Sequence, residues 1–111
     1  MKLQHCTLCP KACGADRTRT AGWCGGGAEM RAARAALHFW EEPCISGKGG
    51  AGAVFFSGCA LRCCFCQNRQ ISQEWFGKAI SVSQLSEILL RLQEQGAETL
   101  DLVTGSHYAP W

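Results

Sequence analysis

The chain has 111 residues, of which 47% are hydrophobic and 18% are charged, and its formal net charge is +2 at pH 7. This composition is typical of a folded domain and excludes a disordered segment. A net charge so close to neutral predicts neither a nucleic-acid partner nor an anionic membrane partner. No apolar run has the length of a signal-peptide core or of a transmembrane helix, so we expect a cytoplasmic protein.

Cysteine is the most unusual component, since nine cysteines make up about 8% of the chain. Their odd number and the lack of an export signal argue against a disulfide scaffold, and clustered cysteines in a reducing compartment usually bind metal or iron–sulfur clusters. Disulfides and unligated thiols are the alternatives. The cysteines form two groups with one residue between them: the head cysteines Cys6, Cys9, Cys13 and Cys24; then Cys44; then Cys59, Cys63, Cys64 and Cys66 in the cysteine loop, residues 59–68.

The first elements along the chain are a weak helix and a clearer strand. Residues 28–40 are rich in alanine and are predicted to be helical on propensity alone. The glycine-rich residues 46–52 lack the spacing of a phosphate-binding loop and are interpreted as a turn. Residues 53–57 form a short apolar run, as expected of a strand buried on both faces of a parallel sheet.

A helix and a second strand follow the cysteine loop. Apolar residues recur at helical spacing between Ser81, a suitable N-cap, and Gly96, which suits a helix C-terminus. Residues 99–104 read as the second strand. This order predicts a right-handed βαβ unit with parallel strands, in which ligands bind beyond the carboxyl ends of the strands. The cysteine loop follows the first strand at that end.

The spacing C-x3-C-x2-C selects Cys59, Cys63 and Cys66 as ligands. Using Cys64 in place of Cys63 would bring two ligands too close for three corners of one cube, so we interpret Cys64 as a buried packing thiol. A structural zinc site takes four protein ligands. Three thiolates leave one position open, which is typical of a reactive site.

The cysteine loop resembles that of the radical S-adenosylmethionine (SAM) enzymes, with Phe65 just before the last cysteine. The stretch FFSGCALRCCFCQNRQIS is similar to the branch of pyruvate formate-lyase activating enzymes and their uncharacterised relatives. The segments CTLCPKACGADR, ALHFWEEPCISG and LVTGSHYAP extend this similarity over essentially the whole chain.

The resemblance implies a [4Fe–4S] cluster on Cys59, Cys63 and Cys66, with SAM on the fourth iron and Phe65 against the adenine of SAM. It implies reductive cleavage of SAM to a 5′-deoxyadenosyl radical, with an electron donor such as flavodoxin or ferredoxin. It also suggests a glycyl-radical protein as substrate. The catalytic residues and the substrate are not indicated by this sequence.

The resemblance further implies an α/β fold, the N-terminal part of an incomplete (β/α)6 radical SAM barrel preceded by a Cys-rich head. We place the head at residues 1–50 and the truncated start of the barrel at residues 51–111. Two predicted strands are too few for such a barrel, so we expect a fragment without complete activity. We expect only partial burial of the apolar strand residues Val54, Phe55, Phe56, Leu100, Leu102 and Val103.

The roles of the other candidate ligands are open at this point. The head cysteines hold zinc or a second cluster, or are spare thiols or a regulatory disulfide, and His5 is a further candidate for that site. Cys44 is interpreted as a core thiol, and His38 and His107 as packing or hydrogen-bonding residues. The alternative for the whole chain is a Cys-rich zinc-binding module without catalysis.

Overall fold

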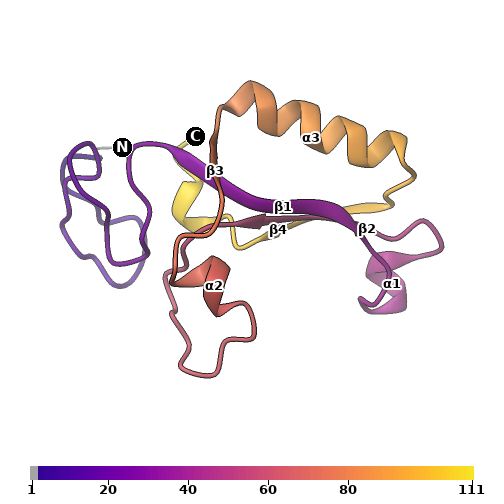
Figure 1. The fold of residues 1–111 in the computed structure, drawn as a ribbon, viewed down its shortest axis with the longest axis horizontal. Helices are drawn as coiled ribbons and strands as arrows, with labels where there is room; N and C mark the ends of the chain where they lie inside the picture. The colour runs from indigo at the N-terminus through magenta and orange to yellow at the C-terminus, as the bar shows by residue number, and fades with distance from the viewer. Residues whose placement is uncertain (1–2) are drawn as a thin grey trace.

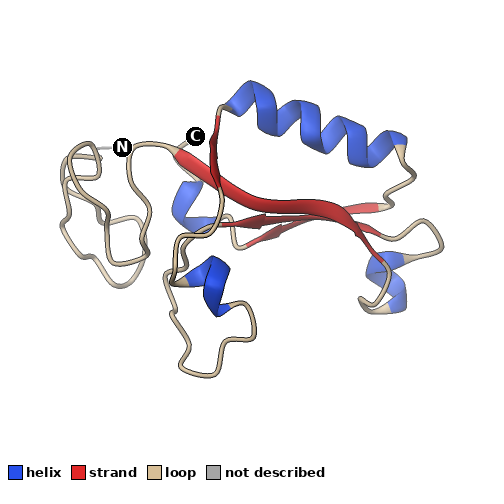
Figure 2. Ribbon diagram, viewed as in Figure 1, coloured by secondary structure: helices blue, strands red, loops and turns tan. Residues whose placement is uncertain are grey.

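The computed structural model describes residues 3–111, in which one four-stranded sheet carries helices on both sides (Figures 1 and 2). Residues 3–29 precede the first strand and contain neither helix nor strand. In chain order the elements are β1 (Met30–His38), α1 (Pro43–Ser46), β2 (Ala51–Phe56), α2 (Arg69–Ser72), β3 (Lys78–Ile80), α3 (Val82–Glu94), β4 (Thr99–Val103) and the 3-10 turn η1 (Ser106–Tyr108).

The sheet is mixed, with the strand order β3-β1-β2-β4. β1 pairs antiparallel with β2 and with β3, whereas β2 and β4 are parallel and in register from Ala51 opposite Thr99 to Phe55 opposite Val103. The predicted parallel pairing of the two strands around the helix is therefore confirmed. Both of these strands end on the side of the sheet where the cysteine loop begins.

The helix predicted for residues 28–40 is wrong, because Met30–His38 is the strand β1. Alanine favours a helix by only a fraction of a kcal/mol per residue over most other residues. Here β1 has a neighbouring strand on each side, and these two ladders supply its backbone groups with partners. Tertiary pairing thus outweighs local propensity.

The elements predicted after the glycine-rich turn are confirmed, with shifts of one or two residues at their ends. β2 covers 51–56 where 53–57 was expected, and β4 covers 99–103 where 99–104 was expected. α3 begins after Ser81 with a capping box, in which Ser81 Oγ accepts from the Gln84 N–H at 3.1 Å and the Gln84 side chain accepts from the Ser81 N–H at 2.9 Å.

The core lies between the sheet and α3, which covers one face (Figure 1). Val54 and Phe56 of β2 are fully buried there, so the expectation of partial burial is wrong for these two side chains. It is confirmed for Leu100 and Leu102 on the edge strand β4, which are 45% and 49% exposed. The central buried cluster consists of Met30, Val54, Phe56, Leu92 and Tyr108.

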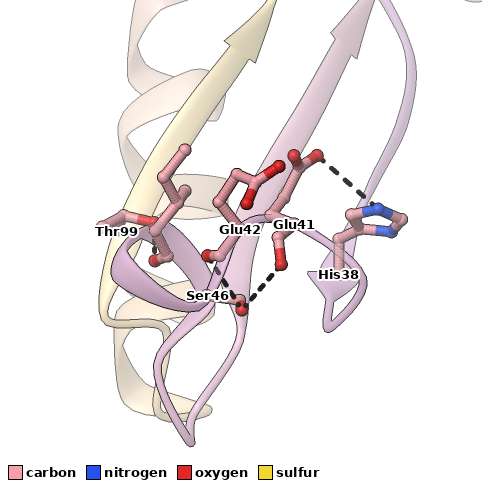
Figure 3. Close-up of polar contacts among 6 residues, drawn as sticks. His38, Glu41, Glu42, Ser46 and Thr99 are labelled. Carbon is pink, nitrogen blue, oxygen red and sulfur yellow. Dashed lines mark hydrogen bonds and ion pairs between the residues drawn. The ribbon is translucent and has the colours of Figure 1, made fainter.

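Polar contacts fasten the opposite end of the sheet, away from the cysteine loop (Figure 3). Ser46 Oγ donates to the carbonyl oxygens of Glu41 and Glu42 at 3.3 and 3.4 Å. Thr99 Oγ1 at the start of β4 donates to the carbonyl oxygen of Ile45 at 2.8 Å. The Thr99 bond attaches α1 to the amino end of β4, and the Ser46 bonds join α1 to the residues just before it, so this end has a structural role.

The barrel expected from the resemblance stays a prediction, since the described part of the chain has one small sheet. The division at residue 50 also stays a prediction, although β1 from the expected head pairs with β2 from the expected barrel. None of the helices in residues 3–111 has the length and apolar character needed to cross a bilayer.

Candidate metal centre

The cysteine loop leaves the sheet through Gly58, two residues after the end of β2. Gly58 has φ of +86°, and a Cβ at this position would collide with the carbonyl oxygen of Cys24. Its N–H donates to the carbonyl oxygen of Ile71 at 3.0 Å. The backbone at Gly58 is thus packed between the head and the segment after the loop, which only glycine permits.

Cys59 lies where the ends of β2 and β4 meet. Its half-buried sulfur accepts a hydrogen bond from Thr104 Oγ1 at 3.7 Å, and Thr104 directly follows β4. Burial would raise the pKa of the Cys59 thiol. The backbone N–H groups of Arg62 and Leu61 and the Thr104 hydroxyl outweigh burial, so the pKa lies below its ordinary value. The surroundings of Cys59 therefore favour the thiolate, which is the form that binds metal.

Cys63 and Cys66 are held by the residues at the end of α2. The Cys66 N–H donates to the carbonyl oxygen of Cys63 at 3.2 Å, which closes a turn between them. Gln73 Nε2 donates to the same carbonyl at 3.1 Å, and Ser72 Oγ donates to Cys66 Sγ at 3.4 Å. Both cysteines are half-buried. Cys66 is therefore, after Cys59, the second predicted ligand whose sulfur accepts a hydrogen bond from a hydroxyl group.

Cys64 and Phe65 lie at the exposed tip of the loop, between the second and third predicted ligands. The interpretation of Cys64 as a buried thiol is wrong, because the tip extends away from the sheet and no core element covers it (Figure 1). Phe65 is 86% exposed. Its contact with adenine stays a prediction, and its exposure leaves the ring free for a planar ligand.

The three loop thiols are one short of a closed shell for a single ion and suit separate irons of a cluster. Among residues 3–111, no three His, Cys, Asp or Glu side chains converge closely enough to hold one metal ion. A cubane cluster makes a different demand, because each thiolate binds a different iron and the sulfurs need not meet at one point. The three half-buried thiols lie on one hydrogen-bonded loop, and Cys59, Cys63 and Cys66 stay the predicted ligands of such a cluster.

The remaining candidates lie in different surroundings. His107 is buried and its Nε2 pairs with the carbonyl oxygen of Ser57 at 2.9 Å, as expected of a hydrogen-bonding residue. His38 lies 3.6 Å from the Glu41 carboxylate at the other end of the sheet (Figure 3). Cys44 is exposed on the short helix α1, so its interpretation as a core thiol is wrong.

Sequence reasoning missed the residues that support the loop from a distance. Thr104, Ser72 and Gln73 are ordinary polar residues without a motif, and only the fold brings them to the cysteines. For Thr104 a signal existed, since it ends the strand parallel to β2 and the carboxyl ends of parallel strands share one edge.

Comparison with known proteins identifies a family for the region that contains the loop. The model of a family described as a 4Fe-4S single cluster domain matches residues 45–109. An uncharacterised protein of Methanocaldococcus jannaschii is 34% identical over 78 residues, which are 70% of this chain and 22% of the relative. The chain thus spans about a fifth of the length of that relative. No solved structure matches. The family model covers more than half of the chain, including all the loop cysteines, and the chain therefore belongs to the 4Fe-4S single cluster domain family.

Proposed function

We propose that Cys59, Cys63 and Cys66 hold one [4Fe–4S] cluster and that this chain is the cluster-binding part of a radical SAM enzyme. The observation that carries the proposal is the position of a three-cysteine loop at the carboxyl end of a parallel strand pair, β2 and β4. In βαβ folds this edge is where ligands bind. The family match supports the cluster, and the C-x3-C-x2-C spacing supports the SAM chemistry.

The number of cysteines decides between a closed and an open cluster. Three protein thiolates would leave one iron without a protein ligand, and the amino and carboxylate groups of SAM would be able to chelate it. The chemistry that such a cluster supplies is one electron to the sulfonium of SAM, which breaks a carbon–sulfur bond and yields methionine and the 5′-deoxyadenosyl radical. The protein contributes binding, orientation and exclusion of water.

The chain's own residues support this role in two ways. Hydroxyl groups of Thr104 and Ser72 donate to Cys59 and Cys66, which stabilises negative charge on these sulfurs. The face of the sheet opposite α3 has a pocket of about 330 Å³ that extends from Phe55 and Val103 to Gln67 and Asn68 of the loop. This pocket is the position in which we place the nucleoside part of SAM.

The proposal extends to the substrate only through the resemblance. The similarity to pyruvate formate-lyase activating enzymes favours a protein glycine as the hydrogen donor and a flavodoxin or ferredoxin as the electron donor. The groups that recognise them would lie on further barrel strands, and this chain spans only 22% of its matched relative. Fold analogy alone does not identify them.

Anaerobic reconstitution with iron and sulfide tests the cluster. We expect about four irons per chain on the loop, lost in Cys59→Ala, Cys63→Ala and Cys66→Ala because three ligands leave no redundancy. The adjacent Cys64→Ala is the matched control and should keep its iron. Retention by Cys63→Ala and loss by Cys64→Ala would show that the other spacing is used.

Electron paramagnetic resonance of the reduced cluster tests the open iron. Added SAM should change the spectrum, whereas 5′-methylthioadenosine, which lacks the amino and carboxylate groups, should not and serves as the comparison ligand. An unchanged spectrum would refute SAM binding by this chain while leaving the cluster in place. Protein that takes up no iron and carries only zinc would refute the whole proposal in favour of a zinc-binding module.

A further inference from the structure

The part of the head described before β1, residues 3–29, contains no helix or strand. Its main internal link is a pair of backbone bonds, from the Cys6 N–H to the Ala15 carbonyl and from the Gly14 N–H to the Cys6 carbonyl, both 3.0 Å long. This pairing brings Cys6 beside the segment that carries Cys13. A segment of this size with so little regular structure usually needs a metal or disulfides to hold it.

Two of the head thiols lie close to one glycine. A Cβ on Gly22 would lie 3.5 Å from Cys13 Sγ and 3.7 Å from Cys24 Sγ, so the two sulfurs flank the same backbone position. Cys9 lies on the adjoining turn, which is closed by the Ala12 N–H on the Cys9 carbonyl at 2.9 Å.

The sulfur of Cys24 accepts a hydrogen bond from the backbone. The Gly26 N–H donates to Cys24 Sγ at 3.2 Å. Such N–H···S bonds stabilise thiolates and orient them in metal sites. The backbone around Cys24 is thus arranged to support a thiolate at one of the four positions.

Arg17 is a buried charged residue close to the head cysteines. It is 1% exposed, and no carboxylate within residues 3–111 forms an ion pair with it. Its Nη1 donates to the His107 carbonyl at 2.7 Å and its Nη2 to the Gly27 carbonyl at 3.2 Å, but Nε has no partner. The guanidinium also lies 5.0 Å from the centre of the Trp111 ring and 5.9 Å from that of Tyr108. A buried guanidinium stays charged, and a nearby anion stabilises it.

The Arg17 guanidinium lies near the Cys24 thiol. A Cβ on Gly26 would contact both Arg17 Nη2, at 2.5 Å, and Cys24 Sγ, at 3.3 Å, so the two groups share one backbone neighbour. Arg17 and Cys6 also line one pocket of about 350 Å³. The positive charge is therefore buried beside thiols and away from carboxylates.

We propose that Cys6, Cys9, Cys13 and Cys24 bind one Zn²⁺ as a closed tetrathiolate site, and that Arg17 is its charge-balancing residue. Four thiolates fill the tetrahedral shell of zinc, as in structural sites, and leave two negative charges on the complex. Arg17 neutralises one of them in a buried environment. Since the described thiols do not yet converge on one point, zinc binding draws Cys9 and its turn inward, and metal binding and folding of the head are linked.

The site can be tested apart from the cysteine loop. We would replace Cys59, Cys63 and Cys66 together with serine in the full chain and titrate it anaerobically with Zn²⁺ and with Co²⁺. We expect one zinc per chain by elemental analysis, and a tetrahedral cobalt spectrum with thiolate charge-transfer bands. The result therefore does not depend on the proposed radical chemistry.

Single substitutions identify the ligands and the role of Arg17. Cys24→Ser should lose zinc, whereas Cys44→Ser, outside both groups, should keep it. Cys9→Ser keeps the buried thiols in place and should weaken the charge-transfer bands, so the test holds even if Cys24→Ser fails to fold. Arg17→Met should lower zinc affinity by about 10–100-fold, as for other outer-shell partners, and Arg17→Lys should restore part of it.

Three outcomes would overturn the proposal. The first is an anaerobic chain that binds no zinc and forms a disulfide between head cysteines. The second is an iron–sulfur cluster on the head cysteines in the loop variant. The third is zinc that is lost in His5→Ala and kept in Cys9→Ser, which would replace one of the four ligands. Unchanged zinc affinity in Arg17→Met would overturn the role of Arg17.

Discussion

The backbone N–H of Cys59 donates a hydrogen bond to the carbonyl oxygen of Cys24, with an N–O distance of 2.8 Å. Two neighbouring contacts join the same segments. Trp23 Nε1 donates to the Ala60 carbonyl at 3.0 Å, and the Arg62 guanidinium lies 4.9 Å from the centre of the Trp23 ring. The first predicted ligand of the loop is therefore attached to the last predicted ligand of the head.

This bond predicts how a head variant affects the loop. Cys24→Ser removes a thiol but keeps the carbonyl that binds the Cys59 N–H, so the loop should still take up about four irons. The melting temperature should fall, because a head without its metal loses folding energy. Iron content and thermal unfolding measure the two effects separately. Loss of the loop iron in this variant would show that the head thiol itself is needed for the cluster.

A second prediction concerns Gly58. Gly58→Ala places a Cβ against the Cys24 carbonyl at a backbone angle that L-residues rarely adopt, and we expect a loss of about 1–3 kcal/mol in unfolding free energy. Urea unfolding of the apo chain measures it. Gly27→Ala is the control, since a Cβ there has nothing within 4 Å. Equal stability of the two variants would contradict the close packing of head and loop.

A third prediction follows from His107. Burial, followed by the charge of Arg17, lowers the pKa of its imidazole, although the bond to the Ser57 carbonyl opposes this shift. Tyr108 is the other titratable group against its ring, at 4.2 Å between ring centres. The unfolded chain therefore takes up a proton at about pH 6.5, before the folded chain does.

The free energy of unfolding should accordingly fall as the pH drops below about 6.5 and continue to fall through the folded-state pKa. Above this range the contribution of His107 is constant. His107→Gln keeps an N–H donor for Ser57 and should remove this part of the pH dependence. Urea unfolding at a series of pH values decides it, and an identical slope in both proteins would rule out His107 as the source.

The fourth prediction is association of the 111-residue chain. β4 is an edge strand with half-exposed Leu100 and Leu102, and such edges pair with other chains. We expect self-association in sedimentation and no catalytic turnover of SAM by the reconstituted chain. Leu102→Lys should reduce association. Leu90→Lys, at an exposed position of α3, is the matched control and should leave association unchanged. A stable wild-type monomer that turns over SAM would contradict both expectations.

The elements around the loop could be predicted because their signals are local. α3 has a capping serine and helical periodicity, and β2 and β4 are short apolar runs. β1 could not be predicted, since alanine and arginine show no alternation there and its pairing depends on distant strands. The three residues of β3 are too few for a sequence pattern.

For the site, the sequence predicted which cysteines to group and at which edge of the sheet the loop lies. It did not predict that the head packs on the loop, because the bond from Cys59 to Cys24 joins backbone atoms and depends on no particular side chain. It also missed Arg17, whose importance lies in its burial and its lack of a carboxylate partner within the described residues. Such properties exist only in three dimensions.

The strand order β3-β1-β2-β4 determines at which edge the parallel part of the sheet can be extended. Both edges of β2 are occupied, by antiparallel β1 on one side and by parallel β4 on the other. A further strand that continues the parallel pair of β2 and β4 must therefore be added beyond β4. The antiparallel strands thus act as a terminus of the parallel array, and the cysteine loop lies beside its first member.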